Sequence, residues 1–116
     1  MTQPIGSRLH GIIDYAVGGS LIAASRLPPL RGRFAGRALL GAGANHLLYS
    51  AVTDYEVGLV RKLPYRAHLA VDAVAACGLL AAGLLQNDAL DRAVPLGVAL
   101  QELTVVALSD PGGAGA

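Results

Sequence analysis

Residues 8–14 read RLHGIID, and residues 66–72 repeat the same pattern of arginine, histidine and aspartate as RAHLAVD. The two copies lie 58 positions apart, and each stands at the start of a long apolar stretch. Residues four apart are neighbours on the surface of an α-helix, so a helical conformation brings each histidine next to its aspartate. The repeated pattern therefore predicts two helical units of one kind, each carrying the same His/Asp pair.

The composition indicates that lipid surrounds much of this chain. Hydrophobic residues make up 53% of its 116 residues and charged residues 15%, whereas an ordinary soluble domain carries about 25% charged residues. The length predicts a single domain over residues 1–116. The net charge of +1 argues against a nucleic-acid partner, which would require clustered lysine and arginine.

Four apolar stretches are long enough, or nearly so, to cross a bilayer as helices, which takes roughly 20 residues. They cover about residues 9–27, 36–60, 65–86 and 93–109. None of them alternates with the period of two that a β-strand would show. We therefore predict an all-α integral membrane protein, a four-helix bundle that crosses the inner cell membrane several times.

The second and fourth stretches also match each other. NHLLYSAVTD at residues 45–54 aligns with QELTVVALSD at residues 101–110, at a shift of 56 positions. The aligned polar pairs are Asn45 with Gln101, His46 with Glu102, Thr53 with Ser109, and Asp54 with Asp110. The chain is thus predicted to consist of two helical hairpins, at about residues 8–54 and 66–110, related by a pseudo-twofold axis along the membrane normal.

The run from Arg8 to Asp110 includes LHGIIDY, YSAVTDYEVGLVRKLP and AHLAVDA. In these segments the chain resembles small bacterial four-span membrane proteins of the SPW-repeat type. The resemblance implies two hairpins in a membrane and no particular activity. Residues 24–26 and 82–84 read ASR and AGL where that family has Ser-Pro-Trp, and the chain contains no tryptophan.

Charged residues are predicted to gather near one membrane surface. The first and third helices start at the face where the second and fourth end, so their polar turns share one layer. The residues of this layer are Arg8, His10, Asp14, Asp54, Glu56, Arg66, His68 and Asp72. His46 and Glu102 lie deeper and are expected to form an inner polar pair. An ionised group inside a bilayer costs at least about 2.5 kcal/mol, so such a cluster indicates a functional site by default.

The cluster suits acid/base catalysis on a lipophilic small molecule, of the hydrolase, isomerase or cyclase type. An aspartate beside a histidine orients the imidazole and makes it a general base near neutral pH. In this hypothesis Asp14 and Asp72 are the central acid and base, with Asp54 as a third carboxylate and His10 and His68 as partners. The predicted substrate-binding residues are Arg8, His46, Tyr49, Glu56, Arg66 and Glu102. The two arginines would hold an anionic head group or stabilise developing negative charge.

Two other functions fit the same residues. The chain could be a proton-coupled transporter or channel that works as a homodimer, or a structural membrane protein whose helices are clamped by ion pairs. The catalytic hypothesis requires no cofactor, but a divalent metal is possible, with His10, Asp14, His68 and Asp72 as its ligands. The expected partners are membrane lipid, the lipophilic molecule and a second copy of the chain. Tyr15, Tyr55 and Tyr65 are expected to anchor the helix ends at the membrane interface.

Overall fold

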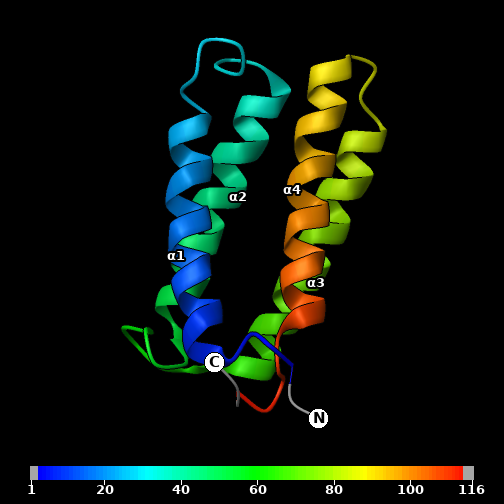
Figure 1. The fold of residues 1–116 in the computed structure, drawn as a ribbon. Coiled ribbons are helices and arrows are strands. Elements are labelled where there is room, and N and C mark those ends of the chain that lie inside the picture. The colour runs from blue at the N-terminus through cyan, green and yellow to red at the C-terminus, as the bar shows by residue number, and fades with distance from the viewer. Residues whose placement is uncertain (1–2, 114–116) are drawn as a thin grey trace.

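A computed structural model describes residues 3–113 of the chain. Four long helices and two very short strands are present in this part of the chain (Figure 1). They are α1 (Ser7–Ala24), α2 (Phe34–Ala51), β1 (Thr53–Asp54), β2 (Leu63–Pro64), α3 (Tyr65–Leu84) and α4 (Ala89–Leu108). The predicted all-α, four-helix architecture is confirmed, and the helix bounds follow the predicted stretches closely except at the end of α2.

The helix α2 ends at Ala51, whereas the apolar pattern predicts a helix as far as residue 60. The chain folds back after Val52, whose carbonyl accepts hydrogen bonds from the backbone amides of Lys62 and Leu63. Strands β1 and β2 pair in parallel inside this loop. Gly58 lies so close to the carbonyl of Thr53 that a Cβ atom there would be 1.9 Å from the oxygen. The apolar pattern missed this loop because Val57, Leu59 and Val60 continue the apolar stretch, although the backbone hydrogen bonds there are not helical.

The helices pair as two hairpins that stand side by side (Figure 1). Helix α1 packs along α2, and α3 packs along α4, while the hairpins meet mainly through contacts of α2 with α4 and α3. Within the first hairpin Gly18 and Gly43 let the backbones approach, since a Cβ on Gly43 would lie 2.7 Å from the carbonyl oxygen of Gly18. Both chain ends and the 52–64 loop lie at one end of the bundle, opposite the two hairpin turns.

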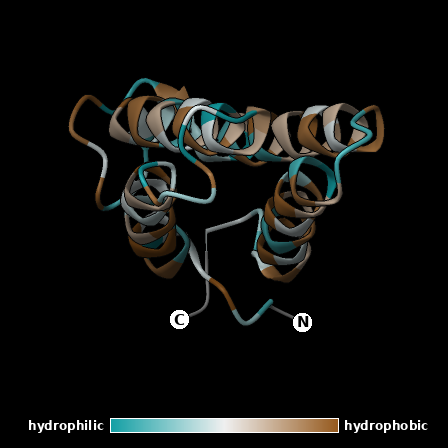
Figure 2. Cartoon of the chain, turned by 90° about the horizontal axis from the view of Figure 1, so that it is seen from above, coloured by the Kyte–Doolittle hydropathy of each residue, from teal (hydrophilic) through white to brown (hydrophobic). Residues whose placement is uncertain are grey.

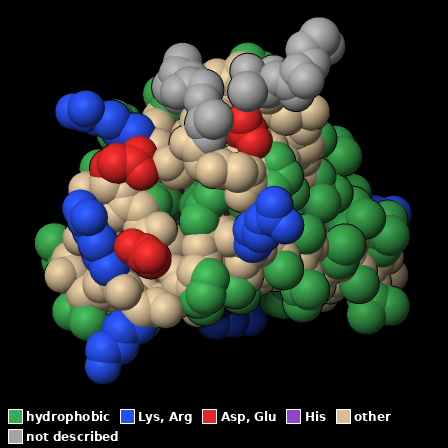
Figure 3. Space-filling model, turned by 90° about the horizontal axis from the view of Figure 1, so that it is seen from below, with side chains coloured by type: hydrophobic (Ala, Val, Ile, Leu, Met, Phe, Trp, Pro, Cys, Tyr) green, Lys and Arg blue, Asp and Glu red, His purple; other side chains and the backbone are tan. Residues whose placement is uncertain are grey.

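Polar side chains are buried in this bundle and many large apolar ones are exposed. Hydrophobic residues run along all four helices (Figure 2). Leu48, Val74 and Leu85 are 70%, 73% and 81% exposed. The buried polar side chains are Ser7, His10, Asp14, Ser25, His46, Ser50, Thr53, His68, Asp72, Glu102 and Ser109. Seen from the end that carries both chain ends, charged side chains gather in one part of the face and a broad hydrophobic area lies beside them (Figure 3).

By length and composition, α3 is the one helix among the described residues that is apolar enough to cross a membrane. The other three helices are of similar length but contain more charged or polar residues. The structure therefore confirms the helical bundle, whereas the predicted multi-pass membrane location is not confirmed.

Candidate functional site

The two copies of the repeated pattern meet at the centre of the bundle. His10 and Asp14 come from α1, and His68 and Asp72 come from α3, one pair from each hairpin. Their exposed fractions are 0%, 1%, 0% and 2%. One ligand-type atom from each of the four lies within 4.8 Å of the other three. The structure therefore brings together the four residues predicted as the centre of the site, and we call them the core tetrad.

Within the core tetrad each histidine lies closer to the aspartate of the other hairpin than to its own. His10 Nε2 is 2.9 Å from Asp72 and 3.3 Å from Asp14. His68 Nε2 is 2.9 Å from Asp14 and 3.3 Å from Asp72. The sequence spacing predicts partners within one helix, and the bundle adds shorter pairs across the hairpins. The tetrad thus joins the two halves of the molecule.

Two hydroxyl groups set the orientation of the tetrad histidines. His10 Nδ1 lies 2.7 Å from Ser109 Oγ, and His68 Nδ1 lies 2.7 Å from Thr53 Oγ1. Each hydroxyl donates its own hydrogen, over 2.6 Å, to the backbone carbonyl four residues earlier. A hydroxyl has a single hydrogen to donate, so it must accept one from the imidazole. Both histidines therefore carry a hydrogen on Nδ1 and turn Nε2 toward the carboxylates.

The two carboxylates are held by a surrounding set of donors. Asp14 accepts hydrogen bonds from His46 Nε2 at 3.0 Å and from the Tyr55 hydroxyl at 2.9 Å. Asp72 accepts a hydrogen bond from the Tyr49 hydroxyl, which also lies 3.1 Å from His46 Nδ1. Burial raises the pKa of the Tyr55 phenol above its usual range, and the negative charge of Asp14 raises it further. Tyr55 therefore stays protonated and acts as a donor.

An inner polar pair lies one step deeper in the bundle. His46 Nδ1 is 3.6 Å from Glu102 Oε1, as the alignment of the two repeats predicts. Glu102 Oε2 is buried and has no hydrogen-bond partner among the described residues. A cavity of about 10 Å³ lies between this pair and the two tetrad aspartates. This volume is roughly that of one water position, so the tetrad itself has no room for an organic molecule.

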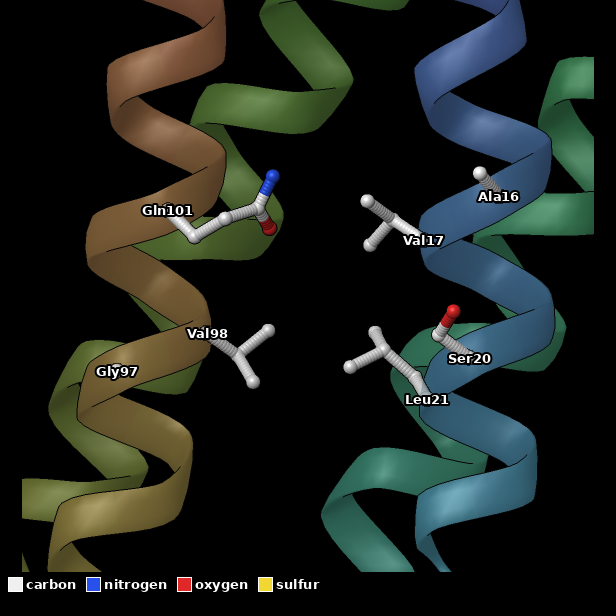
Figure 4. A pocket seen from close by; sticks show the side chains of 7 residues that line it. All are labelled: Ala16, Val17, Ser20, Leu21, Gly97, Val98 and Gln101. Carbon is white, nitrogen blue, oxygen red and sulfur yellow. The ribbon is translucent and has the colours of Figure 1, made fainter.

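Two larger pockets open on the sides of the bundle. One, of about 290 Å³, lies between α2 and α3, and its inner wall includes His46, Tyr49 and Glu102. The other, of about 360 Å³, lies between α1 and α4, where Val17, Leu21, Val98 and Gln101 extend into the space between the helices (Figure 4). The first pocket is thus the one that reaches the inner polar pair. We call it the lateral pocket.

Four of the predicted site residues lie outside this centre. Arg8, Asp54, Glu56 and Arg66 are all exposed. Glu56 accepts a hydrogen bond from the Ser7 hydroxyl at 2.7 Å. Asp54 and Arg66 face a separate hollow of about 470 Å³ at the end of the bundle. The prediction that Asp54 points into the bundle is wrong because α2 ends three residues before it, so helical spacing no longer determines its direction.

Sequence reasoning missed several groups that hold the centre. Tyr55 and Tyr65, expected at the membrane interface, are 3% and 9% exposed and pack beside the tetrad histidines. Thr53 and Ser109 were not among the predicted site residues, although the alignment of the two repeats pairs them. Their position at matching helix ends was the available signal, since the repeat places each of them near a tetrad histidine.

No protein-family model matches this chain, and no curated protein or solved structure is significantly similar to it. The resemblance to SPW-repeat proteins therefore stays a prediction. The chemistry must be inferred from the geometry: two imidazoles and two carboxylates in a closed core, and a histidine and a glutamate beside a pocket that opens sideways.

Proposed function

We propose that this chain is a four-span integral membrane protein that catalyses an acid/base reaction on a lipophilic small molecule. The observation that carries the proposal is the lateral pocket, a hollow in the side of the bundle that is lined in part by the buried His46 and Glu102.

The distribution of side chains supports a lipid environment. Histidine, aspartate and glutamate are inside, while leucine and valine side chains up to 81% exposed are outside. This arrangement is costly in water, where exposed apolar surface is unfavourable. The low average hydropathy of α1, α2 and α4 comes partly from polar residues that face the interior and would not touch lipid. The longest dimension of the molecule, 41 Å, matches a bilayer with its head groups, about 40–45 Å.

The lateral pocket combines the features of a small-molecule site. At about 290 Å³ it is at the lower end of the range for ligand pockets, about 300–1,000 Å³. One side of its lining is apolar, with Ala42, Ala75 and Leu79, and its polar lining residues are Asn45, His46, Tyr49 and Glu102. A lipophilic molecule could enter from the bilayer without crossing water. At the inner wall it would meet Glu102 and His46.

His46 and Glu102 have the roles of acid and base in this proposal. His46 Nε2 donates to Asp14, and Tyr49 gives its hydrogen to Asp72 and so accepts from His46 Nδ1, which makes the ring an imidazolium that can offer a proton. A neighbouring carboxylate with one unpartnered oxygen can take a proton up. His46 also donates to Asp14, and Tyr49 donates to Asp72. These hydrogen bonds connect the pocket to the core tetrad, which can exchange protons with the inner pair. Asp14 and Asp72 thus act behind the groups that touch the substrate.

The membrane location is tested by alkaline carbonate extraction of membranes from expressing cells. We expect the protein to remain in the membrane pellet and to need detergent for release. Recovery of folded protein in the carbonate supernatant would contradict a lipid-embedded bundle.

The catalytic part is tested with a lipophilic epoxide, styrene oxide, in lipid nanodiscs. His46 would protonate the epoxide oxygen as its C–O bond breaks, while Glu102 takes a proton from the attacking water, which yields the diol. Loss of a general base typically costs about 10²–10⁴-fold in rate, so Glu102→Gln should abolish diol formation. Glu56→Gln is the matched control because Glu56 is exposed. No diol formation with wild type, or equal rates for both variants, would contradict the proposal.

A second candidate, a purely structural clamp, is favoured by the closed state of the core tetrad. Its carboxylates receive hydrogen bonds from several helices, and the adjoining cavity of about 10 Å³ admits no substrate. A clamp predicts that Glu102→Gln changes only stability. The rate measured on folded Glu102→Gln protein therefore separates the two candidates.

A further inference from the structure

The core tetrad leaves one buried nitrogen without a hydrogen bond. His68 Nε2 has no hydrogen-bond partner among the described residues, although Asp14 lies 2.9 Å away. The carboxylate does not lie along the direction of a hydrogen on that nitrogen. His68 is fully buried, and an unsatisfied polar atom at such a site requires an explanation. The nitrogen belongs to the group of four ligand-type atoms within 4.8 Å of one another.

The charge of the core tetrad points the same way. Two carboxylates buried side by side repel each other unless positive charge lies between them. Without an ion, His10 Nε2 donates to Asp72, so a hydrogen on each of its nitrogens gives that ring a positive charge. Because Nδ1 of both tetrad histidines carries its hydrogen toward a hydroxyl, a divalent cation that replaces the Nε2 hydrogens binds two lone pairs and balances the two carboxylates.

We propose that His10, Asp14, His68 and Asp72 bind a single divalent transition-metal ion, with zinc as the best fit. This site goes beyond the proposed catalysis and does not depend on it. Nitrogen ligands distinguish such a site from calcium or magnesium sites, which are built from oxygen. Four ligands drawn from two helical hairpins are also a common way to hold a metal inside a bundle.

The spacing of the ligand atoms suits a tetrahedral ion. With bonds of about 2.0–2.2 Å, the ligands of a tetrahedral zinc ion lie about 3.3 Å apart. The four closest His/Asp contacts in the tetrad are between 2.9 and 3.3 Å, and they involve both carboxylate oxygens of Asp14. One ligand atom from each residue lies within 4.8 Å of the other three, so side-chain rotation must shorten the longer separations to hold the ion.

Each proposed ligand already has the outer partner that metal sites require. Metal-binding histidines usually donate their second ring hydrogen to a hydrogen-bond acceptor, and such partners fix the ring orientation. Ser109 and Thr53 do this for His10 and His68 at 2.7 Å. The carboxylates are held in turn, Asp14 by Tyr55 and Asp72 by Tyr49. The hydroxyl partners of the two histidines come one from each half of the chain, whereas both tyrosines come from the first half.

The first experiment measures metal content. The protein is purified in detergent without chelators through a tag that binds no metal, and elements are quantified by mass spectrometry. We expect about one zinc per chain. Protein stripped with chelator and titrated with Co²⁺ alone should show the strong visible absorption of a tetrahedral cobalt site. Substoichiometric zinc, iron and manganese together with no such absorption would overturn the proposal.

The second experiment assigns the ligands. Asp72→Ala should lower the affinity for Zn²⁺, measured by competition with a zinc indicator, about 100-fold or more, whereas the exposed Asp54→Ala should not change it. If Asp72→Ala does not fold, Thr53→Val still decides, because it keeps all four ligands and removes one outer partner. Loss of such a partner typically costs 10–100-fold in affinity. Wild-type affinity in Thr53→Val would overturn the assignment.

Metal binding and catalysis fail in different ways. Zinc binding without diol formation from styrene oxide would leave the metal site standing and remove the proposed reaction. Diol formation that depends on Glu102, in a protein that binds neither Zn²⁺ nor Co²⁺, would support the proposed reaction and overturn the metal site.

Discussion

Ion pairs join the two hairpins in two regions of the bundle, and the two regions differ in their access to water. At the end with the hairpin turns, Arg33 pairs with Asp88, and both side chains are 40–49% exposed. In the other half the core tetrad is at most 2% exposed. Water screens the first pair, whereas the tetrad must satisfy its charges internally. Similar residue types thus form an exposed surface contact at the end with the hairpin turns and a desolvated cluster inside the bundle.

At the exposed end, the pKa of the Asp88 carboxyl reflects its role as a helix cap. A hydrogen bond from the backbone amide of Asp91 holds the pKa of the Asp88 carboxyl below its usual range, and Arg33 lowers it further. Asp88 also caps the first turn of α4. Asp88 therefore serves mainly to begin α4, and this role requires no partner in the other hairpin.

Removal of one tetrad carboxylate should have the largest effect on stability. Asp72→Ala leaves His10 Nε2 without its partner at 2.9 Å, and breaking a buried ion pair typically costs about 3–5 kcal/mol. Unfolding of the detergent-solubilised protein, followed by circular dichroism, measures the loss. Asp88→Asn is the comparison at the exposed end. A loss for Asp72→Ala no greater than that for Asp88→Asn would remove the distinction between the two ends.

Removal of the Thr53 hydroxyl, which holds His68, should have the second-largest effect on stability. Thr53→Val keeps the shape of the side chain but leaves the His68 Nδ1 hydrogen unpaired, which typically costs about 1–3 kcal/mol. Thr104→Val is a matched control because the exposed Thr104 hydroxyl also bonds a carbonyl four residues earlier, that of Leu100, at 2.7 Å. Equal unfolding free energies for the two variants would show that the buried hydroxyl has no special role.

At the end with the hairpin turns, close backbone packing should contribute more to stability than charge does. A Cβ on Gly36 would lie 2.1 Å from the carbonyl oxygen of Leu30, so Gly36→Ala should destabilise the bundle by about 1–2 kcal/mol. The control is Gly41→Ala, where a Cβ meets nothing within 4 Å and the better helix propensity of alanine adds up to about 1 kcal/mol. Thermal unfolding of both variants checks the opposite signs. Stabilisation by both would mean that the turn relaxes freely.

The smallest effect is expected from the exposed ion pair. Arg33→Gln removes the charge that contacts Asp88 and Asp91 while leaving the Asp88 cap in place. Its unfolding midpoint should be close to wild type at low salt and indistinguishable from it at high salt, where exposed pairs are screened. A large shift of the unfolding midpoint that persists in high salt would show that this pair is protected from screening, as the buried tetrad is.

Much of the fold follows from local pattern. Long apolar stretches predicted all four helices, and the spacing of RLHGIID and RAHLAVD predicted that the two pairs meet. The end of α2 at Ala51 was missed because apolar residues continue as far as Val60 between the polar ones. That error moved Asp54 into the predicted site, whereas the third buried carboxylate is Glu102.

The sequence by itself determined the helices and the layer in which His10, Asp14, His68 and Asp72 gather, because periodicity and spacing are local properties of the chain. Tertiary structure decided which aspartate each histidine meets, that Thr53 and Ser109 hold the rings, and that His46 and Glu102 reach the lateral pocket. Such contacts depend on the rotation of each helix about its axis and on separations of about 3 Å. Hydropathy and spacing do not encode distances on that scale.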